Sequence, residues 1–303
     1  MYKQIYIKLS QIEGIGRKSM LLFRGYIKDN NIKMNTLDNT DIIEVYRNIK
    51  SIDKRIKVPT IDELKVADEK SNKIIDDCIK NKIKITTIED KNYPNEFREI
   101  DAPPILYYSR GNHNLLLHDK KIAIIGTRYP TNRGKKYAYD IAQYFTNRDY
   151  VIVSGLANGC DTYGHRGCVE NNGKTIVTLP SDVLNIYPKE NMQLAEKIIE
   201  NDGCIISEYP VKTQIKGYQF IERDRLQAAL SKVVIVIETD VDSGTMHTVK
   251  FTRKYKKRLA CLTFPKSLEK YKVVQGNKIL LKNKNVIKIS NFSDLKDIEE
   301  VYE

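Results

Sequence analysis

The sequence predicts a doubly wound α/β domain preceded by a small helical module. After residue 121, short apolar runs alternate with helical stretches, which is typical of strands and helices in a mostly parallel sheet. Two of these runs, IAIIG and VIVSG, end at a glycine where a helix begins, as buried parallel strands do. Residues 1–78 show no strong strand pattern. We therefore expect a helical module over 1–78 and the α/β domain over 79–303.

The helical module contains a candidate helix-hairpin-helix. Residues 9–22 read as a helix, a glycine hairpin and a second helix, with Gly-Ile-Gly at 14–16. Glycines at such a turn let two helices approach closely and can leave amides free for a DNA backbone. A plain turn within a packing module is an equally good interpretation, because the signal is short. Amphipathic helices over 38–65 and 70–80, broken by Pro59, complete the module.

The α/β domain begins with short strands between proline turns, over residues 84–112. Regular alternation follows, and it places a ligand crevice at the carboxyl ends of the strands. We expect strands near 121–125, 150–154, 175–179, 204–207, 233–237 and 259–262, and helices near 133–148, 160–171, 190–201, 220–231 and 245–257.

The charge of the chain favours an acidic partner. A net charge of +12 and a pI near 9.2 suit nucleic acid, whose phosphates bind lysine and arginine with release of counterions. Dense basic runs lie at 133–136 and 253–258. The alternative is that the charge reflects a composition rich in Lys, Ile and Asn throughout, and that each run is a solvated helix face.

The cysteines and the apolar segments predict a cytoplasmic protein without membrane contact. The five cysteines are odd in number and form no C-x-x-C pair, so we expect reduced, buried thiols and no metal site. The longest apolar strand, 233–237, is far shorter than a membrane span, and the amino-terminal segment carries charges within any apolar core.

The first two turns from strand to helix are candidates for binding an anion. Gly126, Thr127 and Arg128 form the first turn, which lacks G-x-G-x-x-G and so does not predict a dinucleotide site. The Arg128 guanidinium can bind two phosphate oxygens at once. Ser154 and Gly155 lie at the second turn, where a hydroxyl and bare backbone can reach a phosphate oxygen.

Asp161 and His165 follow the second turn, four residues apart on one helix face. They can be interpreted as an acid/base pair. The commoner interpretation is that Asp161 caps the helix and His165 holds the loop together, so we assign no catalytic residue.

A third cluster combines an aromatic residue with two arginines. Phe220 can stack on a base while Arg223 and Arg225 hold the backbone of a nucleic acid. The alternative is an internal ion-pair network of these arginines with Glu222 and Asp224.

The fourth cluster follows the apolar run that ends before Glu238. Ser243, Gly244 and Thr245 precede a helix, and a glycine flanked by hydroxyls at that position is an amide nest suited to an anion.

Taken in order, these segments resemble the DNA-processing protein A family (DprA, also called Smf). The resemblance covers about residues 84–282, and its strength lies in the number and order of the motifs. The helical front with Gly-Ile-Gly is similar to that family's small N-terminal module. The matching segments are YP, APPILYYSRGN, IAIIGTR, VIVSGLANGCDTYGH, KTIVTLPSDVLNIYPKEN, CIISEYP, FIERDRLQAALS, VVIVIETDVDSGT, and FP with QGNKIL.

The resemblance implies an extended Rossmann-like domain that dimerises, binds single-stranded DNA and loads the RecA recombinase during natural transformation and recombination. It implies no catalytic residue, no cofactor and no metal. The DNA-binding residues that it implies are Gly126, Thr127, Arg128, Ser154, Gly155, Lys174, Phe220, Arg223, Arg225, Ser243, Gly244 and Thr245.

The sequence departs from the family pattern at three places. Asp224 stands where the family often has asparagine, and a carboxylate there would weaken the attraction for phosphate. Cys160 replaces an aliphatic residue, which a buried site tolerates. The chain ends at Glu303 soon after the last strand, so we expect it to lack the winged-helix domain that many family members carry.

Two other functions remain as alternatives. The same superfamily includes nucleotide-hydrolysing LOG-type phosphoribohydrolases, whose P-G-G-x-G-T-x-x-E loop is similar in position to residues 242–245. Thr248, preceded by His247, occupies the position of the catalytic glutamate in that loop. The other alternative is a scaffold that senses DNA or a nucleotide with the same crevice.

Overall fold

The computed structural model describes residues 2–303 and divides the chain into two compact units. The first unit extends to Tyr93 and includes Asp101–Tyr108, and the second comprises Pro94–Ile100 and Ser109–Glu303. The boundary expected after residue 78 falls inside α4 (Ile61–Lys80), because that helix continues to the end of its apolar pattern. The five cysteines are all buried and unpaired, as predicted.

The first unit is mainly helical, and its helices begin at well-formed caps. Asp38 and Thr60 each accept a hydrogen bond from the first turn of a helix and complete a capping box. The candidate hairpin is a turn in which Gly14 has a φ of +84°, a conformation that favours glycine. The core includes the stacked rings of Phe23 and Tyr46. The elements are α1 (Tyr2–Ser10), α2 (Arg17–Asp29), η1 (Met34–Thr36), α3 (Asn39–Ile52), α4 and β1 (Lys84–Thr87), and β2 (Leu106–Gly111) crosses into the second unit.

The second unit is built on a parallel sheet in the order β6-β5-β4-β3-β7-β8-β9. The chain runs outward from β3 in one direction and then returns to β7, so the topological switch point lies between β3 and β7. The doubly wound fold predicted from the sequence is confirmed. The strands are β3 (Lys121–Ile125), β4 (Val151–Ser154), β5 (Thr175–Thr178), β6 (Cys204–Ser207), β7 (Val233–Val236), β8 (Arg258–Leu262) and β9 (Ile287–Ile289).

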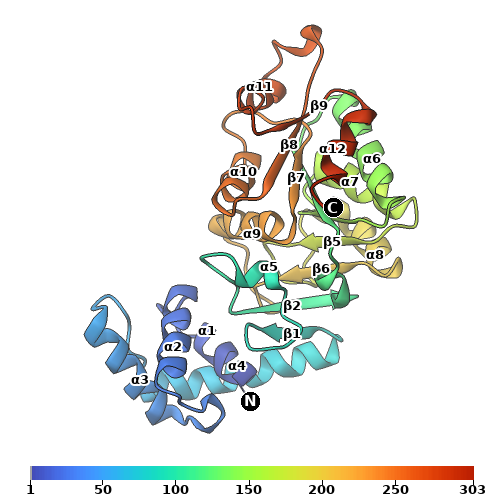
Figure 1. The fold of residues 1–303 in the computed structure, drawn as a ribbon. Helices are drawn as coiled ribbons and strands as arrows, with labels where there is room; N and C mark the ends of the chain where they lie inside the picture. Colours follow the sequence, from blue (N-terminus) through green and yellow to red (C-terminus); the bar gives the residue numbers. More distant parts are fainter. Residues whose placement is uncertain (1) are drawn as a thin grey trace. The chain divides into compact units, whose positions relative to one another are not determined.

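Helices cover both faces of this sheet (Figure 1). The helices α6, α7 and α8 lie on one face, and α9 and α10 on the other. Because both faces are covered, the strands are buried along nearly their whole length, which explains their continuous apolar runs. The helical elements are α5 (Asn95–Arg98), η2 (His113–Leu117), α6 (Asn132–Thr146), α7 (Cys160–Val169), η3 (Lys189–Asn191), α8 (Met192–Glu200), α9 (Gly217–Leu230), α10 (Thr245–Lys254), η4 (Lys266–Leu268), η5 (Lys272–Val274), α11 (Gln275–Leu280), η6 (Phe292–Leu295) and α12 (Lys296–Glu299).

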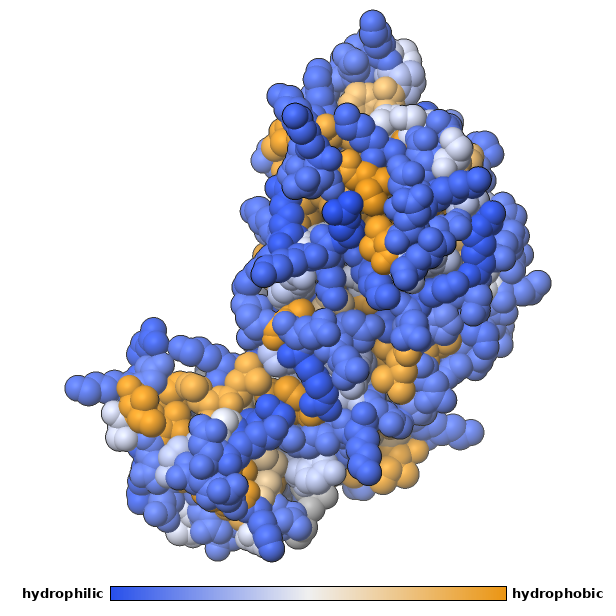
Figure 2. Space-filling view, in the orientation of Figure 1, coloured by the Kyte–Doolittle hydropathy of each residue, from blue (hydrophilic) through white to orange (hydrophobic). Residues whose placement is uncertain are grey.

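The surface is largely hydrophilic, in keeping with the high content of charged residues. Figure 2 shows hydrophilic residues over most of the visible face, with hydrophobic residues confined to separate areas. Within residues 2–303, no helix combines the length and the apolar character that crossing a lipid bilayer requires.

Candidate nucleic-acid interface

Two adjoining pockets form a groove at the carboxyl edge of the parallel sheet. Their volumes are about 450 and 420 Å³, and residues that follow β3 and β4 line both of them. The edge next to the switch point is where open α/β sheets bind ligands. We call the two pockets together the rim groove. The residues that both pockets share are Arg128, Tyr129, Ala157, Phe220 and Arg223.

Arg128 presents a free cation in the rim groove. Its side chain is exposed and forms no ion pair within residues 2–303, and its guanidinium carbon lies 5.8 Å from the centre of the Phe220 ring. Thr127 holds the turn in place, because its amide donates to the Glu238 carbonyl oxygen at 2.7 Å. A Cβ at Gly126 would lie 2.9 Å from that same oxygen, so the close approach of the two strands requires glycine.

The residues that follow this turn are fixed by a buried carboxylate. Glu238 accepts hydrogen bonds from the Thr131 amide at 2.8 Å and the Thr131 hydroxyl at 2.6 Å. The Thr131 hydroxyl in turn accepts from the Gly134 amide, and thereby caps α6. These hydrogen bonds therefore join the segment that follows β7, which begins with Glu238, to the segment that follows β3.

The amino terminus of α10 forms the other anion-binding part of the rim groove. Ser243, Gly244 and Thr245 line the 450 Å³ pocket together with Arg128. No hydrogen bond in the described part of the chain uses the amides of Gly244 and Thr245, and no side chain caps the helix. Free amides at the positive end of a helix attract an anion. The structure thus brings two separate sequence clusters into one pocket.

The second turn differs from the expectation, because an internal carboxylate already occupies its amides. Asp161 accepts hydrogen bonds from the amides of Gly155 at 3.1 Å and Ala157 at 3.3 Å. Ser154 is fully buried, and its hydroxyl donates to the Ile124 carbonyl oxygen at 2.6 Å. The hydroxyl of Ser154 and the amide of Gly155 are therefore used within the fold, although Gly155 does line the 420 Å³ pocket.

The two arginines of α9 are buried and paired, as the alternative interpretation of that cluster holds. Arg223 donates to the carbonyl oxygens of Gly155 at 2.6 Å and Thr178 at 3.1 Å, and it pairs with Asp224 at 3.2 Å. It still lines both pockets from beneath.

Arg225 points elsewhere. Its side chain is 1% exposed, pairs with Glu208 at 2.6 Å and Glu222 at 3.3 Å, and lines neither pocket. The structure therefore pairs this charge inside the protein, away from the rim groove, and a contact of Arg225 with DNA stays a prediction.

Lys174 is also placed away from the rim groove. It precedes β5 and so lies at the amino edge of the sheet, opposite the pockets. Its ammonium pairs with Asp202 at 2.5 Å, with both side chains about half exposed. The sequence contained this signal, because a residue that precedes a strand of a parallel sheet lies at the amino edge of that sheet.

Burial changes the titration of three groups beneath the rim groove. The pKa of His165 falls to about 3 because the ring is buried and lies near Arg223, and its Nδ1 lies 2.8 Å from the Thr175 hydroxyl. Burial also raises the pKa of Asp161. The pKa of Asp224 rises to about 7, through burial and the nearby Asp161, against the opposing charges of Arg223 and Arg128. Asp161 and His165 serve separate partners and share no hydrogen bond in the described structure.

Aromatic residues that the sequence analysis did not select surround Arg128. Tyr129 is 83% exposed and lines both pockets. Tyr187 packs edge to face on Phe220, with ring centres 5.4 Å apart. Exposed rings beside a cation are suited to stacking on nucleobases. The adjacency of Tyr129 to the arginine turn was a signal in the sequence, whereas Tyr187 comes from a distant segment.

The position of the LOG-type catalytic glutamate is occupied by Thr248, which is buried in the wall of the 450 Å³ pocket. Among residues 2–303, no group of three or more His, Cys, Asp or Glu side chains is arranged to hold a metal ion.

Comparison with known proteins places these features in a family. The model of the family described as "DNA recombination-mediator protein A" matches residues 84–299. Protein Smf from Synechocystis is 38% identical over 172 residues, which are 56% of this chain and 43% of the relative. DNA processing protein DprA from Bacillus subtilis is 35% identical over 161 residues, 53% of this chain and 54% of the relative. The match thus spans about half the length of these curated relatives.

Two solved structures share the fold. DNA processing protein A from Streptococcus pneumoniae superimposes with a TM-score of 0.80 at 26% identity, covering 98% of this chain and 97% of that protein. DNA processing protein A from Helicobacter pylori, described for its single-stranded DNA binding mode, gives a TM-score of 0.64 at 30% identity, covering 73% of this chain and 98% of that protein.

Proposed function

We propose, from the premise that this chain belongs to the DNA recombination-mediator protein A family, that its rim groove binds single-stranded DNA through the phosphate backbone. One observation carries the proposal: the unpaired guanidinium of Arg128 and the free amides of Gly244 and Thr245 line the same pocket. An arginine fork and a helix amino terminus are each suited to phosphate, and together they are suited to neighbouring phosphates on one strand.

The aromatic residues favour an unpaired strand over a duplex. Bases of single-stranded DNA are free to stack on side chains, and each such contact contributes about 1–3 kcal/mol. Tyr129 offers an exposed ring, and the pair Tyr187 and Phe220 offers a second surface beside Arg128. Stacking and phosphate binding are both tolerant of sequence, so we expect little base preference.

The wider role that we propose follows from family membership. The chain would act in the cytoplasm as a homodimer that protects single-stranded DNA and loads RecA onto it in natural transformation and recombination. The family's description as a recombination mediator, and relatives named as DNA processing proteins, support this role. Binding without hydrolysis is favoured, because Thr248 cannot replace a catalytic glutamate.

The test compares Arg128→Ala with Arg166→Ala. Each guanidinium carbon lies 5.8 Å from the centre of an aromatic ring, but Arg166 lines neither pocket. We expect Arg128→Ala to lower the affinity for oligo-dT by about 1.5–3 kcal/mol, or roughly 10- to 150-fold, because a charge-assisted phosphate contact is lost. Fluorescence anisotropy measures the affinity, and Arg166→Ala should bind like the wild type.

Unchanged affinity of Arg128→Ala would remove this residue from the interface. Nucleotide hydrolysis is assayed in parallel. Hydrolysis by the wild type, together with an affinity for oligo-dT that does not respond to salt, would favour the nucleotide-hydrolysing alternative, since binding to several phosphates must weaken as salt increases.

A further inference from the structure

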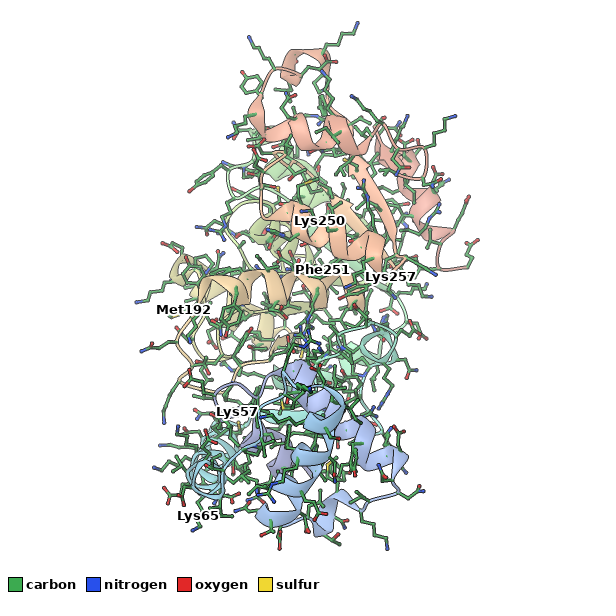
Figure 3. All side chains as sticks on the ribbon, turned by 90° about the vertical axis from the view of Figure 1, so that its left-hand side faces the viewer. Lys57, Lys65, Met192, Lys250, Phe251 and Lys257 are labelled. Atoms are coloured by element: carbon green, nitrogen blue, oxygen red, sulfur yellow. The ribbon has the colours of Figure 1, made fainter. Side chains whose placement is uncertain are left out.

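The helix α10 connects the rim groove to the opposite edge of the sheet. Its first residues line the 450 Å³ pocket, and because it joins two parallel strands it runs back to their amino ends. His247 lies in the pocket wall, and Lys250 and Lys254 follow it at intervals of three and four residues, on the same exposed helix face. Figure 3 shows Lys250 and Phe251 on this helix and Lys257 beyond its end.

Two cations on this exposed face, Lys250 and Arg253, have no ion-pair partner in the described part of the chain. The helix itself contains no acidic residue. Like charges three or four residues apart on a helix repel one another. The helix dipole accounts for cations in the last turn, such as Arg253 and Lys254, but not for Lys250 in the middle. The repulsion is relieved when an anion lies along the face.

The neighbouring residues extend the same feature. Lys256 and Arg258 are exposed just beyond the helix, whereas Lys257 is nearly buried and lies 3.8 Å from Glu99. The rings of Phe251 and Tyr255, which are both partly buried, stack on each other with their centres 5.8 Å apart. A row of cations beside aromatic rings is the combination that proteins use to bind a single strand without sequence preference.

The length of the helix sets the length of this row. Ten helical residues span about 15 Å. That length corresponds to about four nucleotides at the 3.4 Å per-strand spacing of duplex DNA, and to fewer if the strand is extended. A strand held in the rim groove therefore reaches α10 with its next few nucleotides.

We propose that the exposed face of α10, with Lys250 and Arg253, is a second phosphate-binding track that continues from the rim groove. The track carries the nucleotides that flank those in the pockets, and it sets the length of DNA that the protein covers. This inference rests on the proposed binding of single-stranded DNA in the rim groove. It assigns the basic run near residues 253–258 a role beyond that of a solvated helix face.

The test measures affinity for a short and a long oligo-dT, one sized for the pockets alone and one of about 20 nucleotides. The variant is Lys250→Gln with Arg253→Gln. The control is Arg166→Gln with Lys197→Gln, which removes the same charge from exposed side chains of α7 and α8, on the other face of the sheet. Thermal unfolding confirms that both proteins fold.

We expect the α10 variant to bind the short oligomer like the wild type and the long one roughly five- to tenfold more weakly. Its plot of log affinity against log salt should be shallower by about 1.4 for the long oligomer, since each lost phosphate contact contributes about 0.7. The charge-retaining variant Lys250→Arg with Arg253→Lys should bind both oligomers like the wild type.

Three results would overturn the track. They are equal weakening for both lengths, no weakening for either, and the same weakening in the control, which would indicate a general effect of net charge. Failure of the wild type to bind either oligomer would instead refute the proposed function, and the track with it. If the α10 variant binds both oligomers as tightly as the wild type, the proposed function stands. The basic face of α10 would then serve another partner, such as an acidic protein.

Discussion

The turn after β3 and the helix α9 both carry arginines that the sequence marked as candidates for binding DNA, and the fold treats them in opposite ways. Arg128 is exposed and forms no ion pair in the described chain, so its guanidinium is available to a ligand. Arg223 and Arg225 are buried, and both donate to acceptors inside the protein. The comparison indicates that a guanidinium is available to a ligand only where the fold leaves it without an ion-pair partner. Residue type and spacing alone do not distinguish the two situations.

Removing the buried arginine should produce the largest effect. We expect Arg225→Ala to lower the free energy of unfolding by about 3–5 kcal/mol, because it removes a side chain that is 1% exposed and takes away the shared cation of Glu208 and Glu222. Urea denaturation measures this change. Affinity for oligo-dT, expressed per folded molecule, should be unchanged, in contrast to Arg128→Ala. Weaker DNA binding by a folded Arg225→Ala protein would break the distinction between the two regions.

A substitution at Gly155 should make the buried Arg223 more like the exposed Arg128, by displacing it from its acceptors inside the protein. A Cβ at this position would overlap the Arg223 guanidinium and lie 2.7 Å from the side-chain amide of Gln227. We expect Gly155→Ala to displace Arg223 from its carbonyl acceptors and to destabilise the protein by about 1–3 kcal/mol. Denaturant unfolding tests this expectation, and the matched control is Gly217→Ala, where no atom lies within 4 Å of the added carbon. Equal stability of the two variants would show that Arg223 is not held as described.

The pH dependence of binding should give the smallest effect. The pKa of Asp224 is raised to about 7, so its carboxyl gains negative charge as the pH rises through neutrality. Because Asp224 lines the 450 Å³ pocket, we expect the affinity for oligo-dT to fall over this interval by about 1 kcal/mol, or roughly fivefold.

Two variants assign the pH effect. Asp224→Asn should bind with an affinity that no longer falls in this interval, since it cannot acquire the charge. His247→Gln serves as the control, because His247 is a further titratable residue of the same pocket. If the affinity still falls with rising pH in Asp224→Asn but no longer does so in His247→Gln, His247 and not Asp224 causes the pH effect.

The sequence predicted the fold well because its signals are local. The six strands expected after residue 121 all exist within about a residue of their predicted ends, since each is a buried apolar run. The strand β9 was missed, because Ile287–Ile289 is too short to show a pattern.

The candidate site was predicted only where strand order determines it. The clusters around Arg128 and Gly244 meet because β3 and β7 are adjacent and both end at the same edge. The burial of Ser154 and the pairing of Arg225 depend on Ile124 and Glu208, which come from other elements. Contacts between distant segments carry no signature in a single sequence. These contacts determine which polar groups at the candidate site remain available to a ligand.

The carboxylate of Asp161 has a consequence for the kind of ligand that the protein can accept. Two backbone amides of the turn after β4 already have this built-in oxyanion as their acceptor, at 3.1 and 3.3 Å. A free nucleotide whose terminal phosphate bound to these two amides would have to displace the Asp161 carboxylate. A DNA strand does not depend on these amides, because its phosphates can bind at other points of the rim groove. The occupied turn therefore disfavours a free nucleotide as the ligand and is compatible with the proposed binding of a DNA strand.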